Sequence, residues 1–144
     1  MSCTLEIDRF YKVSHIEDRD VLPLIKPYFL WTPIPSQTLW HLDLKRPLGI
    51  YPGNNWAQCN ACRINVVNRI IYGHCMPSPS NAEYYFAIAP DEDIEKVTKS
   101  MEEWDTFLKE RNINSANLFD VLSVYKLFVK DYQKLPWYNQ IKKK

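Results

Sequence analysis

Alternating and helical patterns of apolar residues divide the chain into a strand-rich first part and a helical last part. Alternation with a period near two predicts strands over residues 4–13, 39–44 and 84–89. Residues 63–72 fit both a strand and a helix, and their β-branched side chains favour the strand. Four prolines within residues 21–36 remove backbone donors, so an irregular path is expected there.

Two amphipathic helices are expected in the segment 91–133. The first begins at Asp91, where a run of acidic residues suits the positive end of a helix dipole. Its apolar stripe recurs at spacings of three and four and consists of Ile94, Val97, Met101, Trp104 and Leu108. Ser115 is positioned to cap the second helix, whose apolar face is wider and which should be the more buried of the two.

Composition supports a single folded domain over residues 1–144. Hydrophobic residues make up 46% of the chain and aromatic residues 14%, which is enough to bury a core. The net charge of +1 gives the whole molecule no general attraction for nucleic acid or anionic lipid. Residues 83–111 nevertheless carry nine acids and four bases, a net charge of −5, whereas residues 112–144 carry six lysines and two aspartates, a net charge of +4. The latter include a basic tail over residues 138–144.

The sequence contains no segment that predicts secretion or membrane insertion. No stretch reaches about 18 apolar residues, and the first residues lack a basic region followed by a long apolar run. A cytosolic location is therefore expected. In a cytosol the four cysteines should stay reduced or bind a metal instead of forming disulfides.

Three cysteines and two histidines form the pattern with the clearest chemistry. Cys59 and Cys62 are spaced so that one turn can aim two thiolates at a zinc ion, which takes about four ligands in a tetrahedron. Adjacent side chains of an extended segment point in opposite directions, so His74 and Cys75 should supply one ligand together. Cys75 is favoured because a thiolate is the softer group. The fourth ligand is then His41 or His74.

Other interpretations of the same residues are open. The thiols could be reduced and unliganded, or could form a redox pair, although a redox pair is expected to open a helix after a strand. A cysteine nucleophile with a histidine base needs an orienting group and an oxyanion site, and no short motif supplies either. A catalytic zinc would need an open coordination position and a base such as Asp43. No enzymatic activity is therefore expected.

The predicted fold class is α+β. It is a small zinc-stabilised single domain with short strands in the N-terminal two thirds and two C-terminal amphipathic helices.

The segment WAQCNACRINVVNRIIYGHC, which follows the turn-rich YPGNN, resembles the small first-reading-frame proteins of sobemoviruses, a group of plant RNA viruses. The resemblance covers about residues 39–81 and rests on a zinc-finger-like set of cysteines with a histidine. It implies that Cys59, Cys62 and Cys75 bind zinc. Members of this family suppress RNA silencing and help the virus to spread, so the resemblance also implies an antagonist of host defence and not a catalyst.

The leading hypothesis is a zinc-binding, non-enzymatic suppressor of RNA silencing from a plant virus, located in the host cytoplasm, with an additional nuclear location left open. Its partner would be a host silencing-pathway protein or a small RNA. No membrane contact is expected, and assembly into a homo-oligomer is left open. One alternative is a general zinc-dependent protein-interaction module that uses the acidic helix. The other is an RNA-binding protein that uses the basic C-terminal third, with binding that weakens steeply as salt rises.

Overall fold

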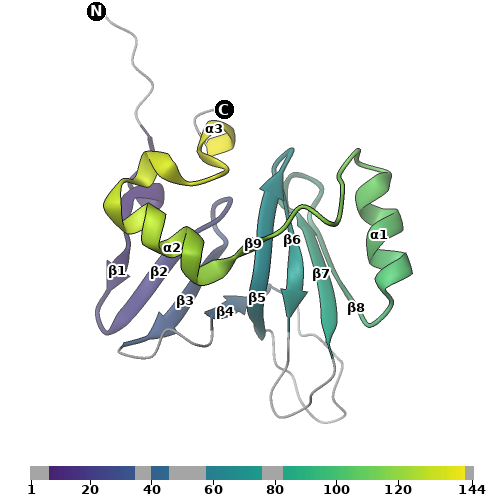
Figure 1. The fold of residues 1–144 in the computed structure, drawn as a ribbon, viewed down its shortest axis with the longest axis horizontal. Helices are drawn as coiled ribbons and strands as arrows, with labels where there is room; N and C mark the ends of the chain where they lie inside the picture. Colours follow the sequence, from purple (N-terminus) through teal and green to yellow (C-terminus); the bar gives the residue numbers. More distant parts are fainter. Residues whose placement is uncertain (1–6, 35–39, 46–57, 76–82, 142–144) are drawn as a thin grey trace, which may run out of the picture.

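One antiparallel sheet dominates the computed structural model, which describes residues 7–34, 40–45, 58–75 and 83–141 (Figure 1). The strands of these residues are β1 (His15–Ile16), β2 (Arg19–Pro23), β3 (Phe29–Pro33), β4 (Trp40–Asp43), β5 (Gln58–Val67), β6 (Ile70–Cys75), β7 (Tyr84–Ala89), β8 (Ile94–Thr98) and β9 (Phe119–Asp120). β1 to β8 pair in sequence order, and β9 pairs with β5. The helices are η1 (Arg9–Lys12), η2 (Pro90–Glu92), α1 (Met101–Lys109), α2 (Val121–Lys130), η3 (Tyr132–Lys134) and α3 (Tyr138–Ile141). The fold is therefore mixed, as expected, with a larger sheet than the short strand patterns suggested.

The sheet buries apolar side chains on both faces. Ile71 and Cys75 of β6 point to one face, where they join a core that includes the buried side of α2. Tyr72 points to the other face, where Trp104 of α1 packs. The indole Nε1 of Trp104 donates to the main-chain oxygen of Phe86 at 2.8 Å. We call these two surfaces the α2 face and the α1 face of the sheet.

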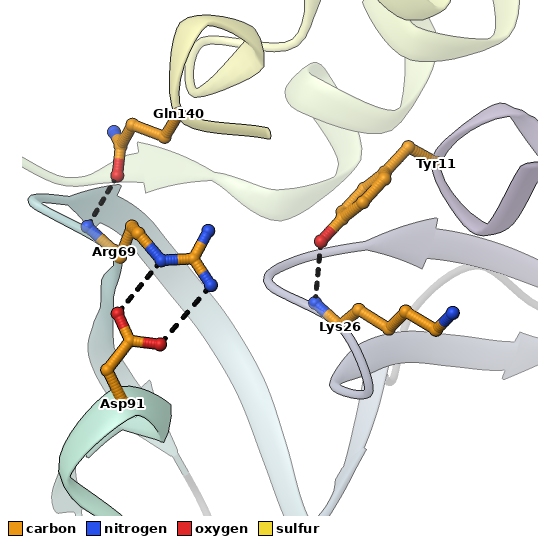
Figure 2. A network of polar contacts seen from close by, with 5 residues as sticks. All are labelled: Tyr11, Lys26, Arg69, Asp91 and Gln140. Carbon is orange, nitrogen blue, oxygen red and sulfur yellow. Dashed lines mark hydrogen bonds and ion pairs between the residues drawn. The ribbon is translucent and has the colours of Figure 1, made fainter. Parts of the chain in front are cut away.

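The turn of the β5–β6 hairpin is held by two distant segments (Figure 2). Asn68 and Arg69 have φ angles of 53° and 62°, as a two-residue turn with left-handed residues requires. The Gln140 side chain accepts from the main-chain nitrogen of Arg69 and donates to the main-chain oxygen of Val66, both at 2.7 Å. The Arg69 guanidinium binds the Asp91 carboxylate through Nε at 2.9 Å and Nη2 at 3.3 Å. The turn is therefore joined to both α3 and η2.

The strand expected at the N-terminus is absent from its described residues, 7–13, and residues 4–6 lie outside the described part. The chain forms η1 instead, and the Asp8 side chain caps it by accepting from a main-chain N–H two residues on. Tyr11 turns into the core, where its hydroxyl accepts from the main-chain nitrogen of Lys26 at 2.9 Å (Figure 2). This cap and this long-range contact outweigh the local alternation.

The expectation of an irregular path was wrong for most of its described residues, 21–34. β2 and β3 form a regular antiparallel pair there. The prolines fit because Pro23 and Pro33 are the last residues of their strands, and Pro27 lies in the connecting loop. No interior ladder hydrogen bond is lost at these positions. Residues 35 and 36 of the expected segment lie outside the described part.

The first helix begins at Met101 and not at Asp91, so this prediction was wrong at its start. Residues Ile94–Thr98 form β8, which pairs with β7. Ser100 then caps α1 by accepting from the main-chain nitrogen of Glu103 at 3.2 Å. Met101, placed in the predicted apolar stripe, is 55% exposed. The stripe therefore combined residues from two different elements.

The second helix begins at Val121, and its cap is Asp120 and not Ser115. The Asp120 carboxylate accepts from the main-chain nitrogen of Ser123 at 3.0 Å. The Ser115 hydroxyl donates to the Asp105 carboxylate at 2.6 Å and so ties the connecting segment to α1. The expectation that this helix is the more buried one is confirmed, because α2 buries four residues and α1 two.

Two other strand predictions are confirmed, and a third is confirmed in part. β4 lies within the predicted segment 39–44, of which residue 39 is outside the described part, and β7 has the predicted bounds, 84–89. Residues 63–67 and 70–72 are strand, but the turn at Asn68 and Arg69 divides them between β5 and β6, so the single strand favoured over 63–72 was wrong at its centre. None of the described helices has the length and apolar character needed to cross a membrane.

Candidate functional site

The predicted zinc ligands lie on three neighbouring strands. His41 belongs to β4, Cys59 and Cys62 to β5, and His74 and Cys75 to β6. These strands are consecutive in the sheet. The sequence spacing therefore identified segments that lie side by side, and the register of the strands decides which side chains meet.

Cys62 occupies an irregular position of β5. Ala61 pairs with Cys75 and Arg63 pairs with His74, so Cys62 is the extra residue of a bulge. Cys62 is exposed, and its Sγ lies 3.8 Å from the main-chain oxygen of His74. The bulge therefore presents this thiol at the surface, next to the backbone of β6.

His74 and Cys75 point to opposite faces of the sheet. Cys75 is fully buried in the core of the α2 face. The His74 ring lies on the α1 face, with its centroid 5.3 Å from the Trp104 ring, and its Nδ1 is 2.8 Å from the Glu83 carboxylate. A single ion cannot be bound by both side chains in this arrangement.

His41 is separated from His74 by β5. It pairs with Trp31 of β3 and with Asn60 of β5, and its ring centroid lies 4.5 Å from that of Trp31. The guanidinium of Arg19 lies 4.1 Å from the same tryptophan ring. Burial lowers the pKa of His41, and a hydrogen bond with Asn60 opposes this shift. The imidazole is thus part of a stacked group on β2 to β4.

The predicted ligands do not form a metal site within the described part of the chain. No group of three or more His, Cys, Asp or Glu side chains there is arranged to hold a metal ion. Cys59 pairs in register with Leu42, but its side chain lies outside the described part. Zinc binding therefore stays a prediction, and the zinc-stabilised part of the predicted fold class is not supported by the described residues.

The surroundings of Cys62 and His74 do not activate a nucleophile. Partial burial raises the pKa of the Cys62 thiol, and the negative charge of Glu83 raises it further. Burial lowers the pKa of His74, while the charge of Glu83 acts in the opposite direction. A reactive cysteine requires a lowered pKa. These groups therefore suit packing and hydrogen bonding better than covalent catalysis.

A shallow groove lined by residues of α1 and β8 is the feature that the cysteine pattern did not indicate. Figure 1 shows the positions of these two elements at one end of the sheet. Its volume is about 580 Å³. The residues that line it include Lys96, Glu102, Glu103, Thr106, Phe107 and Glu110. Three carboxylates and one ammonium group therefore line this open surface.

Two of the groove residues are engaged by neighbours. Glu103 accepts from the Thr98 hydroxyl at 2.8 Å, and the Arg111 guanidinium lies 3.6 Å from the centroid of the Phe107 ring. The acidic composition of residues 83–111 indicated that this part of the surface carries negative charge. The groove itself was not foreseeable, because the residues of β8 had been assigned to a helix.

Comparison with known proteins gives no relative: no family model, no curated protein and no solved structure matches the chain. The site must therefore be interpreted from its own geometry.

Proposed function

We propose that this protein acts by binding another protein and that the groove between α1 and β8 is its binding surface. The observation that carries the proposal is the position of the groove, where the last strand of the sheet lies beside a helix rich in glutamate. A shallow surface with a charged lining suits a protein segment better than a small apolar ligand, which needs an enclosed and mostly apolar pocket.

The charge of the groove favours a protein partner over a small RNA. Glu102, Glu103 and Glu110 would repel phosphate groups at this surface, whereas RNA binding requires Lys and Arg. The described C-terminal residues, 112–141, contain three lysines and two aspartates, a net charge of only +1, so they form no strongly basic surface that competes with the groove. RNA binding through the C-terminal third stays a prediction.

We further propose that this binding suppresses RNA silencing in an infected plant, with a host silencing-pathway protein as the partner. The support for this step is the resemblance of the segment around Cys59, Cys62 and Cys75 to the sobemovirus proteins. Zinc binding by these cysteines belongs to the same proposal, as a stabilising element of β5 and β6.

A leaf assay with a silenced reporter gene tests the proposal, and this is our first prediction. The intact protein should restore reporter expression. The double variant Glu102→Lys/Glu110→Lys should lose most of this effect, because it reverses the charge of the groove. Both residues are exposed. A lysine is unfavourable at the N-terminal end of α1 and favourable at its C-terminal end, so the two changes have opposing effects on the stability of the helix and the fold should persist.

Glu17→Lys is the control for each of the two charge reversals, since it makes one Glu→Lys change at an exposed residue outside the groove. It should restore expression as well as the intact chain does. Full activity of a correctly folded double variant, as judged by circular dichroism and melting, would show that the groove is not the functional surface.

A further inference from the structure

β8 leaves one edge of the sheet open. Within the described ranges it pairs only with β7, and all five of its residues are partly exposed. On such an edge, alternate residues direct their N–H and C=O groups away from the sheet, where another extended chain can pair with them.

The acidic side chain of β8 does not guard this edge. The Glu95 carboxylate accepts from the Tyr28 hydroxyl at 2.5 Å and from the main-chain nitrogen of Lys45 at 2.8 Å. Its charge is therefore directed towards residues from the first half of the chain. Edge strands are commonly protected by charged side chains. Of the two charged residues of β8, Glu95 is engaged in these contacts and only Lys96 is left for that role.

The side chains next to the open edge carry opposite charges on β8 and α1. Lys96 pairs with Ala87, which lies in the core of the α1 face, so Lys96 points to that face. Lys96 lines the groove together with Glu102, Glu103 and Glu110, which form its acidic wall. The groove therefore adjoins the edge strand, and its α1 wall is negatively charged.

We propose that the groove binds an extended basic segment of a partner protein, which adds to β8 as a further strand. This inference rests on the proposed function and names the chemistry of the partner. Backbone hydrogen bonds to β8 would supply affinity, and the glutamates of α1 would select positive side chains.

A second copy of this chain fits the groove less well. If two β8 strands paired antiparallel about a two-fold axis at Lys96, each Lys96 would face its own counterpart, and like charges directly opposite each other destabilise a strand pair. The same symmetry would bring the two acidic walls towards each other. Charge complementarity therefore selects a basic partner.

The geometry of a strand also defines which residues of the partner are selected. Successive side chains of the added strand point to opposite faces. One set would face the α1 glutamates and should be Lys or Arg. The other set would lie on the α2 face, on the same side of the sheet as Val97, which packs against the core there. These side chains should be apolar.

Binding of a synthetic peptide to the full chain tests this inference, and this is our second prediction. The probe is a fluorescent seven-residue peptide of alternating Arg and Val, measured by anisotropy. Two further peptides carry N-methyl groups on alternate amides, one on the Arg set and one on the Val set. Because only one set can donate to β8, one peptide should bind about tenfold more weakly and the other should be unaffected.

The protein variants complete the test. Glu102→Lys/Glu110→Lys should weaken binding of the unmodified peptide about tenfold at low salt, and Glu17→Lys should not change it. Equal binding of both N-methylated peptides, with charge reversal still effective, overturns strand addition but leaves the groove as a protein-binding surface. No binding of the unmodified peptide overturns the inference. Charge reversal without effect here and in the leaf assay overturns the proposed function itself.

Discussion

At the residue scale, Gly73 has little freedom to change. It lies within β6 and pairs with Ile64 of β5 and Phe86 of β7. A Cβ atom there would lie 2.0 Å from the main-chain oxygen of Arg63 and 3.0 Å from the Phe86 ring. The close approach comes from neighbouring strands, so no local pattern around Gly73 could reveal it.

Gly73→Ala is therefore expected to destabilise the fold by about 3 kcal/mol, because the backbone of β5 must move to admit the methyl group. Denaturant unfolding followed by circular dichroism measures this change. Lys126→Ala, at an exposed position of α2, should stay within about 0.5 kcal/mol of the parent. Equal midpoints for the parent and Gly73→Ala would mean that the strands have more space at this point than the structure shows.

At the element scale, local patterns succeeded where one strand or helix had a single periodicity. β7 was predicted with its observed bounds, and the opposite directions of His74 and Cys75 followed from strand geometry alone. The segment from Asp91 failed because Ile94 and Val97 of β8 happen to continue the helical spacing of α1. Pairing with β7 and the cap at Ser100 decide the outcome, and neither is visible in the apolar pattern.

The four-residue helix α3 is too short to be stable alone and should depend on its contact with the β5–β6 turn (Figure 2). Gln140→Ala removes two hydrogen bonds, to Arg69 and Val66, and should cost about 2 kcal/mol of stability. Hydrogen exchange should also show faster exchange of the Arg69 amide. Asn139→Ala changes the exposed amide next in sequence and serves as control. An equal loss of stability in Gln140→Ala and Asn139→Ala would mean that Gln140 does not anchor the turn.

At the scale of the whole molecule, strands far apart in sequence decide the architecture. Tyr28 meets Glu95 across 67 residues, and Tyr125 donates to the main-chain oxygen of Ser14 across 111 residues. Composition and periodicity predicted a mixed fold, but they do not indicate which distant residues come into contact. The candidate site shows the same limit. The predicted ligands lie on three neighbouring strands, but the register of these strands separates His41, His74 and Cys75.

Zinc binding is the prediction that concerns the whole molecule, because an ion shared by β5 and β6 would stabilise the centre of the sheet. Purified protein should contain about one zinc per chain, and a chelator should lower its Tm by about 5 °C or more. Cys62→Ser is the informative variant: the thiol is exposed in the bulge, so its loss should remove zinc with little other damage. Cys75→Ser alters the buried core and would destabilise the fold even without a metal.

Cys3→Ser, which changes the cysteine outside the predicted ligand set, should keep both the zinc and the Tm of the parent. Protein without metal, whose Tm does not respond to the chelator, would contradict the zinc site. Cys62 would then be a surface thiol with a raised pKa, held next to the backbone of β6 by the bulge alone. In that case the sheet would owe its stability to its two apolar faces, and the groove beside β8 would have to function without a metal.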